Sequence, residues 1–226
     1  MYGFVRTFFD SDKKATECLI SMSNLLGRKK RVMQGLKLLH EEGMSKSNIS
    51  LLFRMRAYVL HTNGLKEAFD EVKELGFDPS KVSFVVALVA KVSLSKTKWN
   101  AKVDAFKRWG WSEEAIDAAF RRYPFCMMTS IDKINLIMSF WVNQLGWNSL
   151  DLVIYPFVFG FSLEKRIIPR AFVIQYLLAK GLLKKHASLY TPFAISEKLF
   201  LEKYVKNFEE ERSQLLKLYQ GGKKKN

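Results

Sequence analysis

The chain has 226 residues, of which 48% are apolar and 14% aromatic, so disorder is excluded over most of its length. Lysine and arginine number 37 against 22 acidic residues, and the formal charge of +15 favours a polyanionic partner such as nucleic acid. Cys18 and Cys126 follow no disulfide or metal-site spacing, so we expect two small core residues in a reducing compartment.

Residues 1–35 are predicted to form an N-terminal helical cap. Their basic run, RKKR at positions 28–31, is the densest of the chain. Such runs are more often solvated faces or address tags than DNA contacts. The first dozen residues hold two acidic side chains and no amphipathic Ser/Arg-rich run, so neither a signal peptide nor a transit peptide is expected there.

Five glycines recur at intervals of 33 to 36 residues, and each is followed by a large apolar residue. They are Gly43, Gly76, Gly110, Gly146 and Gly181. Apolar side chains stand four and seven residues before them, with Ser139 as the one exception. This pattern is typical of a helix that buries one apolar face and ends at a glycine in the left-handed conformation. The period predicts an all-α superhelical solenoid of helix–turn–helix repeats, with the array over residues 36–205.

Helix caps are expected in the two repeats that follow Gly43 and Gly76. Ser47 or Asn48 is the candidate cap of the first repeat. In the second, Asp78 is predicted to cap a helix whose first residue is Pro79, where a missing N–H costs nothing.

The repeat from Gly110 to Gly146 has the clearest pattern. Ser112 is a cap candidate, followed by acidic residues that suit a helix start, and Pro124 is expected to end this first helix. Thr129 and Asp132 resemble a capping box for a second helix, which should stop at the glycine.

Residues 134–163 carry a single charge, Asp151, which raises the question of a membrane helix. Polar residues, glycines and Pro156 divide this stretch into pieces too short to span a bilayer, so we expect the buried centre of the array. Ser162 should open the next helix. Residues 206–226 are predicted to be a fraying helix end and a basic tail.

Two stretches resemble a known family. One is KRWGWSEEAI at residues 107–116, followed by FRRYP at 120–124, and the other is SLEKRIIPR at 162–170. Together they resemble the plant branch of the mitochondrial transcription termination factor (mTERF) family. The resemblance implies an organellar protein, mitochondrial or chloroplast, whose helical repeats hold duplex DNA on a concave basic surface. It implies a role in transcription termination or other organellar gene expression.

The sharpest candidate contacts with nucleic acid are Lys165, Arg166 and Arg170. Pro169 removes a helical hydrogen bond, and a kink there would aim the two forked guanidiniums at phosphates. The alternative is a set of local ion pairs with Glu164.

Two further basic pairs are candidates. Lys96 and Lys98 are expected in the turn between two helices, a place that can face a groove. Arg121 and Arg122 fall at a helix end, where phosphate contact and stabilisation of the negative helix terminus are equally good explanations.

Aromatic and catalytic alternatives are weaker. The tryptophans fall mostly at apolar helical positions, so core packing is preferred over base stacking. The histidines lack metal-ligand spacing, and no nucleophile or Gly-rich phosphate motif is present. We therefore expect no enzyme, no metal, no cofactor and no small-molecule substrate.

The leading hypothesis is a monomeric, double-stranded-DNA-binding regulator of organellar transcription that grips the phosphate backbone. An RNA-binding factor for intron splicing or ribosomal RNA maturation is the second. A protein–protein scaffold built of helical repeats is the third, and it is disfavoured by the basic charge.

Overall fold

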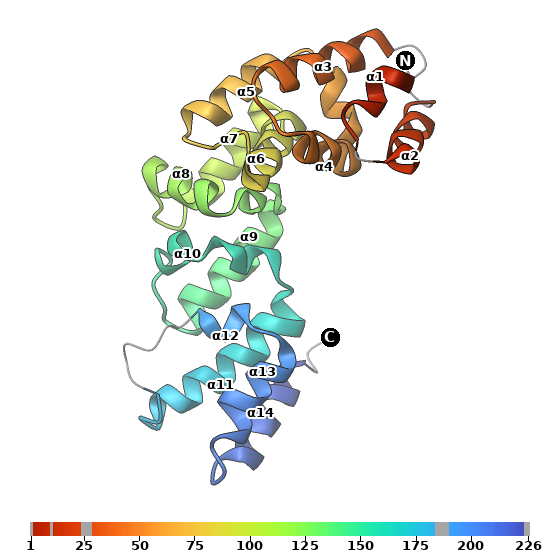
Figure 1. The fold of residues 1–226 in the computed structure, drawn as a ribbon. Helices are drawn as coiled ribbons and strands as arrows, with labels where there is room; N and C mark the ends of the chain where they lie inside the picture. Colours follow the sequence, from red (N-terminus) through yellow and green to blue (C-terminus); the bar gives the residue numbers. More distant parts are fainter. Residues whose placement is uncertain (1, 10, 24–28, 184–189, 224–226) are drawn as a thin grey trace. The chain divides into compact units, whose positions relative to one another are not determined.

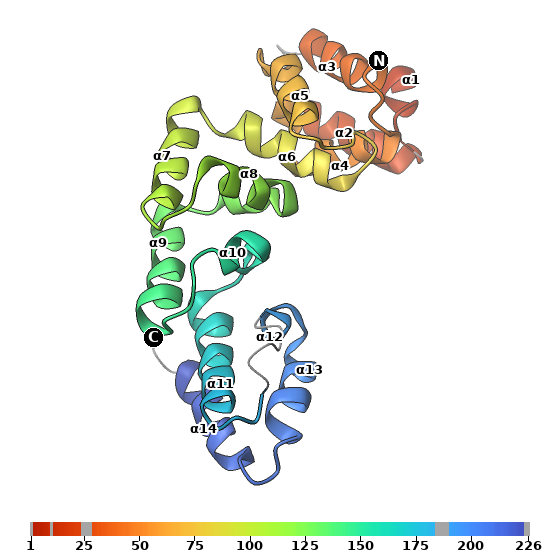
Figure 2. The ribbon, with the colours of Figure 1, turned by 90° about the vertical axis from the view of Figure 1, so that its left-hand side faces the viewer.

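The computed structural model describes residues 2–9, 11–23, 29–183 and 190–223, and within them the secondary structure is entirely helical. The chain forms two compact units. The first comprises Met1–Lys102 with Tyr123–Met128, and the second comprises Val103–Arg122 with Thr129–Asn226. Figures 1 and 2 follow the helices in chain order. The prediction of an all-α fold built from helical repeats is confirmed.

The first unit is built from short helices joined by tight turns. Its elements are α1 (Tyr2–Arg6), α2 (Asp12–Ser23), α3 (Lys29–Glu41), α4 (Lys46–Arg56), the 3₁₀ helix η2 (Ala57–His61), α5 (Leu65–Glu74), α6 (Val82–Ser93) and the 3₁₀ helix η3 (Pro124–Met128). Helix α7 (Lys96–Lys107) begins in this unit and ends in the next.

The second unit mixes α-helices with 3₁₀ and π segments. Its elements are α8 (Glu113–Arg122), α9 (Ile131–Ser139), the π-helix η4 (Phe140–Gln144), α10 (Asp151–Ile154), the 3₁₀ helix η5 (Pro156–Gly160), the π-helix η6 (Leu163–Ile167), α11 (Ile168–Ala179), α12 (Thr191–Ala194), α13 (Glu197–Leu201), the π-helix η7 (Glu202–Lys206) and α14 (Arg212–Lys223). No element of the described ranges is long and apolar enough to cross a membrane.

All five glycines of the repeat pattern have positive φ, between 69° and 87°, which confirms them as left-handed helix stops. At Gly43 the glycine N–H donates to the carbonyl of His40 at 3.1 Å, and Met44 N–H donates to that of Leu39 at 2.9 Å. The same pair of bonds closes the helices at Gly76, Gly110 and Gly181. This is the Schellman arrangement, which satisfies the last helical carbonyls.

The helix before Gly146 differs because its last turn is the π-helix η4. Its closing bond runs from Trp147 N–H to the carbonyl of Trp141 at 3.1 Å, one residue further back than in the other four. Trp141 is consequently fully buried, while Val142, the position predicted from the repeat register, is only half-buried. The extra residue also accounts for Ser139, because Met138 fills the core position one residue earlier.

Helix α6 is the centre of the first unit, and its residues Phe84 to Ala90 are all buried. It packs against α4, α5 and η3. The predicted start of this helix was wrong: it begins at Val82, and Asp78 instead accepts the N–H of Ser80 in the preceding turn. Pro79 therefore lies before the helix.

Two other predicted caps shift by a few residues. Ser45 caps α4 by accepting the N–H of Asn48, and Ser130 caps α9 in place of Thr129. Ser112 and Ser162 cap as predicted, each accepting an N–H three residues on.

Residues 212–223 form a packed helix and not a fraying end, while residues 224–226 of the predicted basic tail lie outside the described residues. Helix α14 packs along α11, as Figures 1 and 2 show, and its Leu215 and Tyr219 join a core with Val173 and Leu177. Gly222 lies so close to Pro169 that an added Cβ would stand 2.8 Å from the proline Cα. The proposed division at residues 35 and 205 stays a prediction, although α3 and η7 run across these positions.

Candidate nucleic-acid interface

Lys96 and Lys98 lie in the first turn of α7 and not in the turn before it, which corrects their predicted placement. Ser95 Oγ accepts the N–H of Lys98 at 3.3 Å and so caps the helix. Both lysine side chains are exposed. The positive end of a helix disfavours nearby cations, so the helix itself does not explain two lysines here.

A cavity of about 480 Å³ opens beside this turn, between α5, the end of α6 and the start of α7. Lys96, Trp99 and Asn100 line it from α7. Lys91 Nζ lies 4.1 Å from the Trp99 ring centroid and 3.0 Å from a carboxylate oxygen of Glu71. Sequence patterning assigned Trp99 to the core, but its side chain is only half-buried.

The other tryptophans divide in the same way. Trp111 and Trp141 are buried, whereas Trp109 and Trp147 are half-buried. Their indole N–H groups are used within the fold: Trp109 donates to Asn135 at 3.0 Å, and Trp111 to the carbonyl of Ser149 at 3.2 Å. Core packing therefore holds fully for Trp111 and Trp141, and only in part for the other three.

Arg121 and Arg122 form the last turn of α8, as predicted. Arg122 Nη1 donates to the carbonyl of Ala118 at 3.3 Å, one turn earlier in the last part of the helix. Arg121 is exposed on the same turn. The geometry favours stabilisation of the helix end as the role of Arg122, and it leaves Arg121 available to a ligand.

Arg166 is held against the segment that joins α12 to α13. Its Nε donates to the carbonyl of Phe193 at 2.9 Å. Its Nη2 donates to the carbonyls of Ala194 at 3.0 Å and Ile195 at 2.9 Å. The guanidinium also lies 3.9 Å from the ring centroid of Phe161. These bonds satisfy carbonyls at the C-terminal end of a four-residue helix.

Arg170 is only 2% exposed. Its Nη1 donates to the carbonyls of Pro192 at 2.6 Å and Ile195 at 2.8 Å, and its guanidinium faces the ring of Phe200. Burial lowers the pKa of Arg170 from its ordinary value. The guanidinium is not turned toward solvent as expected, because its bonds to the carbonyls of Pro192 and Ile195 hold it inside the second unit.

Of the three bases predicted to form the phosphate clamp, Lys165 is the exposed one. Arg166 and Arg170 donate to backbone carbonyls. Glu164, with which local ion pairs were the alternative prediction, instead accepts a hydrogen bond from the hydroxyl of Ser162 at 3.2 Å. The structural role is thus favoured for Arg166 and Arg170, with different partners from those expected. Their contact with phosphate stays a prediction.

In the basic run of residues 28–31, Arg28 lies outside the described residues. Lys30 and Arg31 are exposed on α3. His61, one of the scattered histidines, lines a second cavity together with Arg31.

The helical repeats and this distribution of cations describe a basic, all-helical repeat protein with solvent-facing lysines. The sequence model of the mTERF family matches residues 8–201, and the chain belongs to this family. Its members are in general nucleic-acid-binding regulators of organelles and are not known as enzymes. No curated protein matches the chain significantly.

Proposed function

We propose that this protein binds double-stranded DNA in an organelle and regulates transcription there, holding the phosphate backbone without reading base sequence. The observation that carries the proposal is the pair Lys96 and Lys98, exposed in the first turn of α7 where the helix dipole opposes them. Family membership and the charge of +15 point to the same class of ligand.

Lys165 and Arg121 complete the proposed set of backbone contacts, because they too are exposed. Contacts of this kind position a protein on DNA and carry no sequence information directly. If about six phosphates are neutralised in all, the logarithm of the binding constant should fall with the logarithm of salt concentration with a slope near −5.

Titration of duplex DNA at several salt concentrations tests the proposal. Replacing Lys96 and Lys98 together with Gln should weaken binding equally for unrelated sequences and reduce the slope by about 1.8. The control is Lys37→Gln with Lys180→Gln, which removes the same charge from two lysines already paired with Glu41 and Glu211. Equal loss in both double variants would contradict a specific contact, and a flat salt response would favour the protein scaffold.

RNA is the second candidate ligand, and the half-exposed Trp99 is the observation that favours it. Unpaired bases stack on aromatic rings, at about 1–3 kcal/mol per base. A Trp99→Ala variant that loses single-stranded RNA but retains duplex DNA would assign the cavity to RNA, and Trp99→Phe should restore stacking. Crosslinking in organelles with sequencing of both DNA and RNA would then identify the ligand used in the cell.

A further inference from the structure

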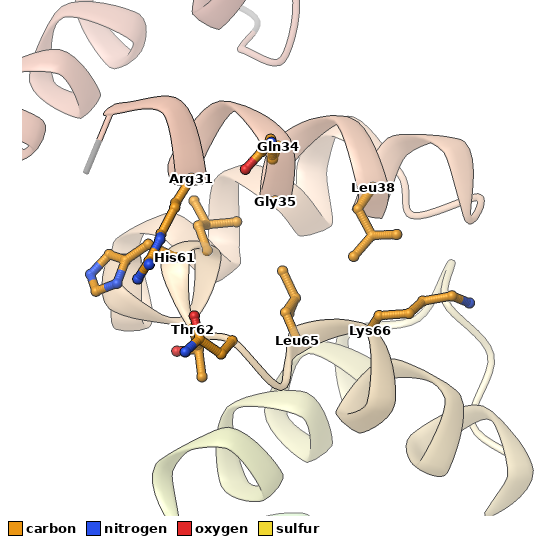
Figure 3. A pocket seen from close by; sticks show the side chains of 10 residues that line it. Arg31, Gln34, Gly35, Leu38, His61, Thr62, Leu65 and Lys66 are labelled. Carbon is orange, nitrogen blue, oxygen red and sulfur yellow. The ribbon is translucent and has the colours of Figure 1, made fainter.

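A second cavity of the first unit, about 380 Å³ in volume, lies between α3 and the segment from η2 to α5. Figure 3 shows Arg31 and His61 at one end of it, with Gln34 above them on α3. Leu38 and Leu65 line the other end. Volumes of this order accommodate small organic ligands.

His61 Nε2 is buried and has no hydrogen-bond partner within the described residues. A buried polar atom without a partner is costly, and native structures rarely keep one unless a water or a ligand completes it. The imidazole lines the cavity, so a ligand there can complete the bond.

Arg31 determines which charge that ligand should carry. Its side chain is exposed at the cavity, and none of the described residues that line the cavity is acidic. A guanidinium next to an imidazole nitrogen that has no partner among the described residues disfavours a cation and suits an anion with several acceptor oxygens. Gln34 adds an amide group on the same helix.

Lys66 contributes little to this end of the cavity. Its Nζ lies 2.8 Å from Glu42 and 2.7 Å from Asp70, and Figure 3 shows it pointing away from Arg31 and His61. Thr62 likewise donates its hydroxyl to the carbonyl of Tyr58 at 3.2 Å. Asn63 also lines the cavity, so the side-chain donors open to a ligand are those of Arg31, His61, Gln34 and Asn63.

The wall between α3 and η2 is set by Gly35. A Cβ at this glycine would stand 2.1 Å from the carbonyl oxygen of Leu60. The backbones of α3 and η2 therefore approach more closely than any other residue allows, and this brings Arg31 and His61 to the same cavity.

We propose that this cavity binds the phosphate of a nucleotide, with Arg31 and His61 donating to its oxygens and the sugar lying toward Leu38 and Leu65. A forked guanidinium matches phosphate oxygens, and the cavity extends beyond its polar end into this apolar half. The phosphate belongs either to a free mononucleotide or to a nucleic-acid strand. The site is separate from Lys96 and Lys98 and rests on the proposed function only for the choice of a nucleotide.

Isothermal titration with inorganic phosphate and with adenosine monophosphate tests the site. Arg31→Gln should weaken binding about tenfold or more, because it removes a charge-assisted hydrogen-bonding group. His61→Phe should weaken it as well. Lys37→Gln is the matched control on the same helix, since Lys37 is exposed and paired with Glu41, and it should bind normally. Thermal melting of each variant checks that it is folded. If Arg31→Gln unfolds, Arg31→Lys takes its place in the titrations.

Two oligonucleotides that differ only in a 5′-phosphate distinguish a strand end from a free mononucleotide as the source of the phosphate. Tighter binding of the phosphorylated strand, lost in Arg31→Gln, assigns the site to a strand end. Competition by the mononucleotide alone assigns it to a free nucleotide. Equal affinity for succinate, no binding at all, or an equal loss in Lys37→Gln would overturn the proposal. Retention of mononucleotide binding by the Lys96→Gln, Lys98→Gln variant keeps the two proposals distinct.

Discussion

Cations serve different purposes in the two units of this molecule. In the first unit Lys96 and Lys98 stand exposed at the start of α7, where the helix dipole is unfavourable to them. In the second unit Arg166 and Arg170 lie against α12 and bind the backbone carbonyls of residues 192–195. The first pair is unexplained by the fold, whereas the second pair is part of it.

This difference shows why basic residues in a sequence do not by themselves define an interface. A guanidinium that satisfies several carbonyls is held by those bonds, and moving it to a phosphate would leave the carbonyls unpaired. Two lysines on a solvated turn have no such commitment. Four predictions test or sharpen the contrast.

The largest effect is expected at Arg170. Arg170→Met should lower the free energy of unfolding by about 3 kcal/mol, because it leaves buried carbonyls without donors. Urea unfolding measures it. Lys165→Gln, a charge removal five residues earlier on the exposed surface, should change stability by less than about 0.5 kcal/mol. Similar losses in both variants would remove the distinction between structural and exposed cations.

The π-helix before Gly146 predicts unequal effects at two equivalent sequence positions, Val72 and Val142. Each stands four residues before a stop glycine, but Val72 is fully buried and Val142 only half. Val72→Ala should cost about 1.5–2 kcal/mol, and Val142→Ala less than about 1 kcal/mol. Thermal unfolding of the two variants checks this, and equal costs would place Val142 in the core after all.

The glycine stops should behave alike in both units. Gly76 and Gly146 both have positive φ, and an added Cβ would meet no atom within 4 Å at either. Replacement by Val should therefore cost about 1–2 kcal/mol of backbone strain in each case, with no clash at the added Cβ. Gly35→Ala serves as the contrast, because there the cost is the clash with Leu60. Unchanged melting temperatures would show that the left-handed stops carry no strain.

The smallest effect is expected at Cys126, a buried thiol of η3. Burial raises the pKa of Cys126 to about 12, so the reactive thiolate is scarce at neutral pH. Iodoacetamide at pH 8 should leave Cys126 of the native protein unmodified and alkylate it after unfolding in urea. Rapid labelling of the native protein would mean that η3 opens readily.

Local geometry explains what could be predicted from the sequence. A glycine at positive φ, the two hydrogen bonds that close a Schellman turn, and a serine hydroxyl that caps a helix all involve residues within six positions of each other. The five helix stops, the caps at Ser112 and Ser162 and the all-helical fold follow from such local rules. The family resemblance, confirmed over residues 8–201, also rests on local motifs.

Which cations face solvent depends on contacts between distant segments of the chain. Arg166 and Arg170 meet carbonyls more than twenty residues later in the chain, and α14 reaches α11 from a segment expected to fray. Arg31 and His61 share a cavity because Gly35 lets two backbones approach. The spacing of charges along a chain specifies local geometry, whereas burial and hydrogen-bond partners depend on which distant segment packs alongside, and that is fixed only when the helices assemble.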